Sequence, residues 1–204
     1  KGKERTRGLM HNKFCAGDDV VVTGSWNPTK GDAANAMIVV YSKYLAQNYR
    51  DEFNELKDRT FGKGERAVYP ILLLNNKTVQ NHFCPEDDCK KAVMSALEKA
   101  NKEVLFIQYS FTDDDVGDLL LEKARKGVQF RGVFDSSQIT QYSEHKKLKD
   151  NSVVKKKVHH KAFVIDESVV VVGRANPSQN GFFENYENIL VVEDAEIARL
   201  YKEE

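Results

Sequence analysis

The sequence lacks a long hydrophobic run, an excess of one charge and a rich supply of cysteine. No apolar stretch approaches the ~20 residues that a membrane-spanning helix requires, and runs such as Ile71–Leu74 have the length of a strand. The 31 basic and 31 acidic residues cancel formally, which excludes a wholly basic nucleic-acid coat protein. Three cysteines are too few for a disulfide framework.

Two of the cysteines, Cys84 and Cys89, are separated by four residues. This spacing leaves open either one bridge or two reduced thiols. A zinc site would need a fourth ligand and closer pairing, so no metal is expected here. No signal peptide is visible, but the sequence begins at Lys1 rather than at methionine, which fits a processed or trimmed start. The compartment, cytoplasmic or exported, is left open.

What remains is the composition of an ordinary globular protein, with 204 residues, 41% hydrophobic and 30% charged. Short β-branched runs alternate with amphipathic stretches, which is typical of an α/β domain whose sheet is flanked by helices. We expect strands at Asp19–Thr23, Met37–Tyr41, Tyr69–Leu74, Val104–Tyr109 and Val128–Phe134, and helices after Ser42, from Pro85, at Asp114–Lys126 and at Ala195–Tyr201.

The end of the chain repeats its beginning. Val170–Gly173 corresponds to Val20–Gly24, Ile189–Val192 corresponds to Ile38–Tyr41, and a predicted helix follows each time. A turn at residues 60–64 predicts a boundary, with 1–64 as part of a first copy and 65–204 as a complete second copy. The first copy lacks the scaffold that precedes the second, which predicts either a trimmed chain or completion by another chain, such as a second copy in a homodimer.

Both copies carry the same polar residues at nearly the same offsets. These are His11, Lys13, Asp18, Gly24 and Asn27 in the first copy, and His159, Lys161, Asp166, Gly173 and Asn176 in the second. In a strand, His-x-Lys places both side chains on one face. A single such pair on a strand more often has no catalytic role. Two pairs with matching aspartates and Gly-x-x-Asn sequences are poorly explained by chance or by packing.

The pattern H-x-K-x4-D-x6-G-S-x-N resembles the HKD motif of the phospholipase D superfamily. Two copies in one chain resemble its two-motif members, whose halves form one site at a pseudo-twofold interface. The stretch FCPEDDCKKAVMSALEKANKEVLFIQYSFTDDD is also similar to the scaffold of small bacterial and archaeal nuclease-like members. The resemblance implies a mixed sheet flanked by helices, in two pseudo-twofold-related halves of which the first is incomplete.

The resemblance also implies a metal-independent phosphodiesterase that works without a cofactor. One histidine attacks phosphorus to form a phosphohistidine and the other protonates the leaving oxygen. The family pattern favours His11 as nucleophile and His159 as general acid. Lys13 and Lys161 are then expected to supply positive charge to the phosphoryl oxygens, with help from the polar side chains of Asn27, Asn176 and Ser25. No cluster of acidic residues with metal-ligand spacing is visible in the sequence.

Glu187 stands where the family has a carboxylate that receives a hydrogen bond from the second histidine, His159. Asn35 falls at the matching place for His11 in the first copy. The resemblance therefore implies an anionic partner for His159 and a neutral one for His11, so that the two imidazoles differ in basicity.

Besides the missing scaffold of the first copy, the sequence departs from the pattern in two places. Arg174 stands where the second motif is expected to have serine, and it either adds charge beside the phosphate or fills the pocket and impairs turnover. The first copy has one residue fewer between Asp18 and its glycine than the second has after Asp166. We expect both aspartates to be structural. Trp26 either lines the site or packs in the core.

Nucleic acid is the favoured substrate, because basic residues precede both motifs as a polyanionic backbone would require. These are Lys1, Lys3, Arg5 and Arg7 before the first, and Lys146, Lys147, Lys149, Lys155, Lys156 and Lys157 before the second. A phospholipase D or phosphatidyltransferase acting on phospholipids uses the same centre and is the first alternative. A catalytically impaired protein that binds nucleic acid is the second, and Arg174 is the feature that allows it.

Overall fold

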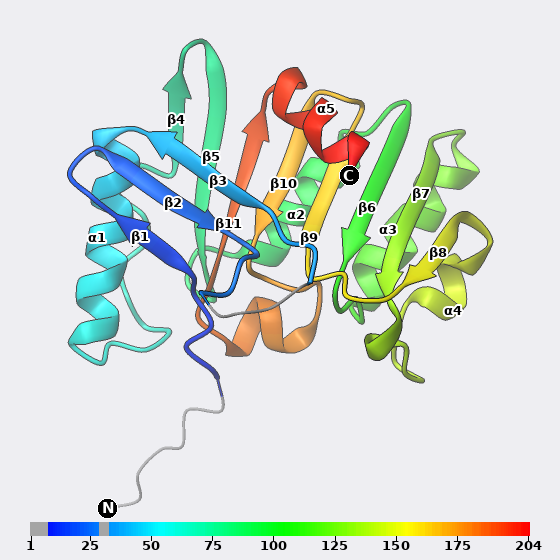
Figure 1. Ribbon diagram of the computed structural model, residues 1–204, viewed down its shortest axis with the longest axis horizontal. Coiled ribbons are helices and arrows are strands. Elements are labelled where there is room, and N and C mark those ends of the chain that lie inside the picture. The colour runs from blue at the N-terminus through cyan, green and yellow to red at the C-terminus, as the bar shows by residue number, and fades with distance from the viewer. Residues whose placement is uncertain (1–7, 29–32) are drawn as a thin grey trace, which may run out of the picture.

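The computed structural model describes residues 8–28 and 33–204, which form a mixed α/β fold around two β-sheets (Figure 1). The basic residues Lys1, Lys3, Arg5 and Arg7 lie outside the described residues. The small sheet has the order β1-β2-β3, with β1 at Phe14–Ala16, β2 at Val20–Gly24 and β3 at Met37–Tyr41. The large sheet has the order β4-β5-β11-β10-β9-β6-β7-β8.

The strands of the large sheet are β4 (Ile71–Leu74), β5 (Lys77–Cys84), β6 (Glu103–Gln108), β7 (Gln129–Asp135), β8 (Ser152–Lys155), β9 (Lys161–Ile165), β10 (Val169–Gly173) and β11 (Glu187–Glu193). The helices are α1 (Lys43–Lys57), α2 (Cys89–Glu98), α3 (Asp114–Arg125), α4 (His145–Leu148) and α5 (Ala195–Glu203), with short turns at Ser136–Gln138, Lys149–Asn151 and Asn180–Glu184. The three strands β6, β7 and β8 run parallel, and the other pairs are antiparallel.

The internal repeat is visible in the topology. Strands β1, β2 and β3 pair in sequence and lead into α1, as β9, β10 and β11 pair in sequence and lead into α5. The side chain of the predicted cap Ser42 accepts a hydrogen bond from the Leu45 amide at the start of α1. The side chain of Asp194 accepts from the amides of Glu196 and Ile197 at the start of α5. Each unit therefore consists of a three-strand meander closed by a helix.

Two hydrophobic clusters hold the layers together. One lies between the large sheet and α2 and α3, which cover the face turned away from the small sheet in Figure 1. The other lies between the two sheets and includes Val21 of the small sheet, Tyr49 of α1, Val170 and Leu190 of the large sheet and Ala198 of α5. The second cluster buries the inner face of each repeat against the other, so the two units face each other.

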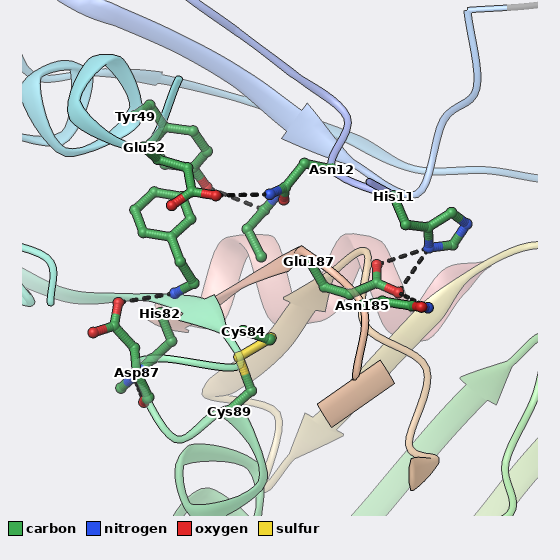
Figure 2. The surroundings of a disulfide bond; sticks show 12 residues. His11, Asn12, Tyr49, Glu52, His82, Cys84, Asp87, Cys89, Asn185 and Glu187 are labelled. Carbon is green, nitrogen blue, oxygen red and sulfur yellow. Dashed lines mark hydrogen bonds and ion pairs between the residues drawn. A yellow bond between two sulfur atoms is a disulfide. The ribbon is translucent and has the colours of Figure 1, made fainter. Parts of the chain in front are cut away.

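The segment around Pro85 differs from the prediction. Helix α2 begins at Cys89 rather than at Pro85, because Asp88 lies in the left-handed region at φ 53° and breaks the helical path. Cys84 and Cys89 form a disulfide with Cα atoms 5.6 Å apart, which decides between the two alternatives left open (Figure 2). Strand β5 was not predicted, since its alternation is interrupted by Asn81, which is buried.

The other predicted elements are confirmed within one or two residues at most ends. Among residues 8–28 and 33–204, no helix has the length and apolar character needed to cross a bilayer.

Candidate active site

The two histidines lie at the junction of the repeats, just before β1 and β9. The chain entering His11 runs parallel to the chain entering Glu187, through a bridge between Met10 and Tyr186. The His11 amide donates to the Tyr186 carbonyl at 3.0 Å. In the same way the chain entering His159 runs beside the chain entering Asn35, and the His159 amide donates to the Ala34 carbonyl at 2.9 Å. Each histidine is therefore held by the opposite repeat.

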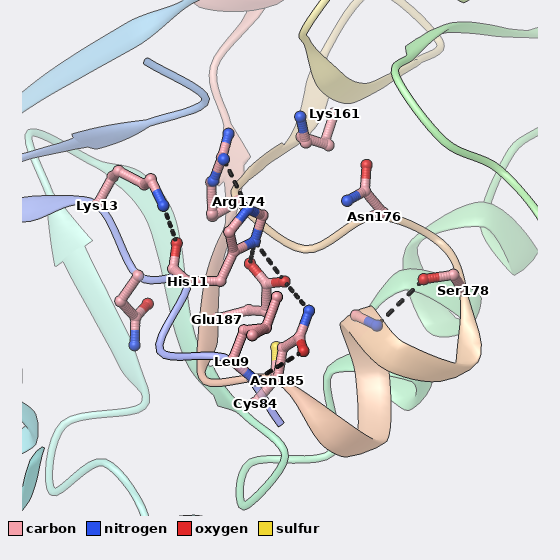
Figure 3. A network of polar contacts seen from close by, with 12 residues as sticks. Leu9, His11, Lys13, Cys84, Lys161, Arg174, Asn176, Ser178, Asn185 and Glu187 are labelled. Carbon is pink, nitrogen blue, oxygen red and sulfur yellow. Dashed lines mark hydrogen bonds and ion pairs between the residues drawn. The ribbon is translucent and has the colours of Figure 1, made fainter. Parts of the chain in front are cut away.

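This crossed arrangement overturns the predicted partners. Glu187 accepts from His11 Nδ1, with its two oxygens at 2.7 and 2.8 Å (Figure 3). His159 Nδ1, by contrast, lies 2.8 Å from Asn35 Oδ1. The prediction assigned Glu187 to His159 and Asn35 to His11. It was wrong because the sequence does not tell which repeat faces which histidine. The anionic partner belongs to His11, and the neutral partner belongs to His159.

Glu187 is fully buried and is itself fixed by the opposite strand and by a neighbour. Its carboxylate also accepts from Asn185 Nδ2 at 3.0 Å, and Asn185 Oδ1 accepts from the Leu9 amide at 3.0 Å. In the sheet, Glu187 pairs with Cys84, so the disulfide lies directly beside the strand that carries the carboxylate (Figure 2). Asn185 is not among the residues predicted from the sequence, where the only indication of its role is that it lies two residues before Glu187.

The two lysines take equivalent positions. Lys13 Nζ donates to the His11 carbonyl at 2.9 Å, and Lys161 Nζ donates to the His159 carbonyl at 2.8 Å. Lys161 also lies over the Tyr109 ring, 4.6 Å from its centroid, and the same ring lies 4.8 Å from the His159 ring. Tyr109 therefore forms one wall of the site. Its position as the last residue of the predicted strand at Val104–Tyr109 is the signal that could have indicated it.

Arg174 lies between the two histidines, with its side chain buried at 2% exposure. Its Nη2 donates to His11 Nε2 at 2.7 Å and to Asn27 Oδ1 at 3.1 Å, and its Nη1 donates to the Ser25 carbonyl at 2.8 Å. Nη1 also lies 3.3 Å from His159 Nδ1 and 3.5 Å from His159 Nε2. Because a guanidinium only donates, His11 Nε2 is an acceptor here, and the proton of the neutral ring lies on Nδ1, facing Glu187.

The site is electropositive and poorly hydrated. Burial, followed by the charge of Arg174, lowers the pKa of Lys13 to about 8 and that of Lys161 to about 6. Burial, followed by the charges of Lys161 and Arg174, lowers the pKa of His159 to about 3. Both effects disfavour a positive charge on these groups while the site holds no anion. An anion bound among them would shift all of these pKa values upward.

The remaining predicted residues either contact Arg174 or lie elsewhere around the site. Asn27 and the Ser25 carbonyl contact Arg174, and the Ser25 hydroxyl accepts from the Ala36 amide at 3.0 Å. Asn176 lies on the Lys161 side of the site in Figure 3, and its Oδ1 accepts from the Ser110 amide at 3.3 Å. Trp26 is 46% exposed, so it does not pack in the core.

The two motif aspartates lie at the far ends of the hairpins, away from the histidines. Asp166 accepts from three backbone amides at 2.8 to 2.9 Å, those of Asn101, Lys102 and Glu103. Asp18 is exposed, and its carboxylate has no hydrogen bond within the described part of the chain. Asp166 therefore ties the β9–β10 hairpin to the loop between α2 and β6. The β1–β2 hairpin is instead tied to α1 by Arg50, whose Nη1 donates to the Asp18 carbonyl at 3.0 Å.

The residue between each histidine and lysine points to the other side of the strand, as the period of two requires. Asn12 Nδ2 donates to Glu52 of α1 at 3.2 Å (Figure 2). His160, at 1% exposure, places Nε2 3.1 Å from a carboxylate oxygen of Glu204, directly after α5. Each repeat thus ties its motif strand to the helix that follows it.

Three carboxylates, those of Glu52, Glu55 and Glu86, have oxygens within 4.8 Å of one another, which the sequence spacing did not indicate. Burial, followed by the neighbouring acidic charges, raises the pKa of Glu52 to about 8, and burial also raises that of Glu86. Proton retention therefore relieves the repulsion in this cluster, which lies around α1 and apart from the paired histidines. Among the described residues, two carboxylates lie at the histidine site: Glu187 contacts His11, and Asp135, which accepts from the Val158 amide at 2.8 Å, interacts with the charges of His159 and Lys161.

A family model described as the cardiolipin synthase PLD-like domain matches residues 93–204. The chain belongs to the phospholipase D superfamily. It is 26% identical over 157 residues to a phospholipase D of Rickettsia prowazekii, covering 72% of this chain and 77% of that protein. As a superfamily member, the protein is a phosphodiesterase.

Solved structures show the same fold. NucT from Helicobacter pylori superposes with a TM-score of 0.58 at 23% identity, over 62% of this chain and 92% of NucT. Phosphatidylserine synthase of Haemophilus influenzae superposes with a TM-score of 0.72 at 12% identity, over 98% of this chain and 62% of the synthase. The second match extends over both repeats of this phospholipase D superfamily protein.

Proposed function

We propose that the protein hydrolyses phosphodiesters without a metal, through a phosphohistidine on His11. The observation that carries this proposal is the contact between His11 Nδ1 and the buried carboxylate of Glu187. A carboxylate on Nδ1 fixes the tautomer whose Nε2 lone pair attacks phosphorus. It also stabilises the positive charge that the imidazole acquires when the phosphorus–nitrogen bond forms.

His159 serves as the proton donor to the leaving oxygen and then as the base that activates water. Its low pKa, about 3, arises from burial and from the charges of Lys161 and Arg174. A bound phosphodiester anion counters these charges and raises the pKa of His159 toward the range of a general acid. Lys13 and Lys161 bind the two non-bridging oxygens and neutralise the charge of the transition state.

Nucleic acid is the proposed substrate. Lys155 and Lys156 are exposed on the segment that leads into His159, where they can follow a phosphate backbone. Lys147 does not contribute, because Asp114 and Asp118 engage it at 2.7 and 3.0 Å. Trp26 presents an exposed ring beside Lys13, and exposed aromatic rings next to cationic grooves stack on unpaired bases.

A phospholipid is the second candidate. A pocket of about 310 Å³ beside Lys13 is lined by apolar side chains that include Met10, Phe14, Trp26 and Met37. Such a lining fits an acyl chain or glycerol backbone next to the phosphoryl group. The relative from Rickettsia prowazekii, which carries the name phospholipase D, supports the same candidate.

The test is a paired cleavage assay in EDTA with labelled single- and double-stranded DNA and RNA, beside phosphatidylcholine vesicles. Cleavage of nucleic acid that persists in EDTA and is lost in both His11→Ala and His159→Ala supports the proposal. Acid-labile, base-stable labelling of the protein that His11→Ala abolishes and His159→Ala retains supports the assignment of the nucleophile. Turnover of lipid alone would replace the substrate, and turnover that requires a divalent cation would overturn the mechanism.

A further inference from the structure

Arg174 places a third cation in a site that needs two for a phosphodiester. Its guanidinium lies between the two imidazoles, with Nη2 2.7 Å from His11 Nε2 and Nη1 3.3 Å from His159 Nδ1 and 3.5 Å from His159 Nε2. This is the space that a phosphoryl group must enter if one Nε2 attacks while the other protonates the leaving oxygen. In the first repeat the equivalent residue is Ser25, whose small side chain leaves that space open.

Only two of the three guanidinium nitrogens have partners among the described residues. Nη1 and Nη2 have partners, but the Nε–H is buried and has no acceptor among the residues the structure describes. A buried cationic donor without an acceptor is costly, and a phosphoryl oxygen is the type of acceptor that a guanidinium edge binds in a bidentate manner. The unmet Nε therefore points to an anionic ligand rather than to a purely structural arginine.

The charged groups of the site also indicate an anionic ligand. The described residues of the site include three basic groups, Lys13, Lys161 and Arg174, against two carboxylates, Glu187 beside His11 and Asp135 beside the segment that enters His159. A phosphodiester has two non-bridging oxygens and one negative charge, which the lysines satisfy. A terminal phosphoryl group has three such oxygens and carries about two negative charges at neutral pH. The third oxygen and the second charge match the third cation.

We propose that Arg174 is a specificity-determining residue that adapts this site to terminal phosphoryl groups, as in phosphomonoesters, in addition to internal phosphodiesters. The inference rests on the proposed phosphohistidine chemistry for turnover, but the binding preference does not. On binding, the guanidinium exchanges the neutral imidazole of His11 for the phosphoryl oxygens, which frees Nε2 for attack.

The reaction on a phosphomonoester balances without any further reagent. His11 Nε2 forms a bond to phosphorus, the bond from phosphorus to the ester oxygen breaks, and His159 protonates that oxygen to release the alcohol. Water then attacks phosphorus, the bond from phosphorus to His11 Nε2 breaks, and the water gives up a proton to His159. This yields inorganic phosphate and returns His11 to its neutral form and His159 to its protonated form. The net reaction consumes one water and produces one alcohol and one phosphate.

Binding of methyl phosphate and of dimethyl phosphate at pH 8 provides a test that needs no turnover. The two probes differ by one methyl group and one charge. We expect the wild-type protein to bind methyl phosphate at least about 10-fold more tightly, a difference of about 1.4 kcal/mol. We expect Arg174→Ser, which restores the residue of the first repeat, to lose this preference and Arg174→Lys to keep part of it. Equal affinity of the wild-type protein for both probes would overturn the proposal, even if no variant folds.

Turnover separates this inference from the proposed function. We expect Arg174→Ser to raise kcat/KM for bis(4-nitrophenyl) phosphate and to lower it for 4-nitrophenyl phosphate, changing their ratio at least about 10-fold. A 5′-phosphorylated oligonucleotide and vesicles of phosphatidate then distinguish the two sources of a terminal phosphate. A binding preference without turnover of any ester would contradict the phosphohistidine mechanism but support the role of Arg174. Turnover of the diester with an unchanged ratio in Arg174→Ser would support the mechanism but contradict the role of Arg174.

Discussion

At the scale of single residues, the two histidines differ in their partners, and this difference can be tested by exchange. Glu187→Gln removes the charge beside His11 and keeps the shape, so we expect kcat on a diester to fall by about 10²–10⁴-fold. Asn35→Asp gives His159 the anionic partner that it lacks, so we expect an upward shift of the His159 pKa and a loss of activity below about 10-fold. Steady-state kinetics and NMR titration of His159 measure both effects, and equal losses of kcat in the two variants would contradict the asymmetry.

Lys161 illustrates the cost that a phosphate site imposes on stability. Burial, followed by the charge of Arg174, lowers its pKa to about 6, whereas an unfolded lysine titrates near pH 10.4. Between these two values the unfolded chain binds one more proton than the folded chain, so stability rises with pH, and the cost is complete below pH 6.

We therefore expect Lys161→Met to abolish activity and to raise Tm, by about 2–4 °C for each kcal/mol recovered. The gain should be greatest below pH 6 and should shrink as the pH approaches 10. Lys13→Met is the matched control, with a smaller gain, because the pKa of Lys13 is lowered only to about 8. Thermal unfolding followed by circular dichroism across this pH range measures the gain, and a gain that grows with pH would contradict the assignment.

At the scale of elements, the motif aspartate connects the β9–β10 hairpin to the scaffold. Burial pushes the pKa of Asp166 upward, but the three backbone amides that it accepts from hold the pKa below the ordinary value. Its stabilising effect is therefore present above about pH 4 and is lost as the pH falls through the folded-state pKa.

We expect Asp166→Asn to cost about 1–3 kcal/mol at pH 7 with little loss of kcat, because an amide nitrogen would face backbone donors far from the histidines. Asp18→Asn, at the equivalent but exposed position, should change stability by less than about 0.5 kcal/mol. Urea unfolding at pH 7 and pH 3 separates the two, since the cost of Asp166→Asn should fade at the lower pH. A large loss of kcat in Asp166→Asn would assign a catalytic role instead.

The sequence sufficed for the strands and helices with clear periodicity and for the two His-x-Lys pairs, because the repeat made their spacing significant. It did not indicate that α2 starts at Cys89, since this depends on the left-handed backbone at Asp88. It also could not assign Glu187 to His11. That contact depends on the bridge between Met10 and Tyr186, which are 176 residues apart and meet only when the two repeats pack face to face.

At the scale of the whole molecule, the repeats have equivalent strands in different surroundings. Gly24 pairs with Met37 as Gly173 pairs with Ile189, so the match predicted between Ile38–Tyr41 and Ile189–Val192 was wrong by one residue. The pairing of Val22 with Val39 in the small sheet therefore corresponds to that of Val171 with Val191 in the large sheet. Val191 is 3% exposed and belongs to the cluster that α2 covers, whereas Val39 is 49% exposed on the outer face of the small sheet. The same residue type therefore contributes very differently to stability at the two positions.

Replacement of each valine by threonine tests this difference, because threonine keeps the shape and the strand preference and adds only a hydroxyl. We expect Val191→Thr to cost about 1–3 kcal/mol, since the hydroxyl enters an apolar cluster. Val39→Thr should change stability by less than about 0.5 kcal/mol, since water already reaches that face. Denaturant unfolding of the two variants measures both costs. A similar cost at Val39 would mean that its face is covered in solution, and that the repeats are alike in their surroundings as well as in their topology.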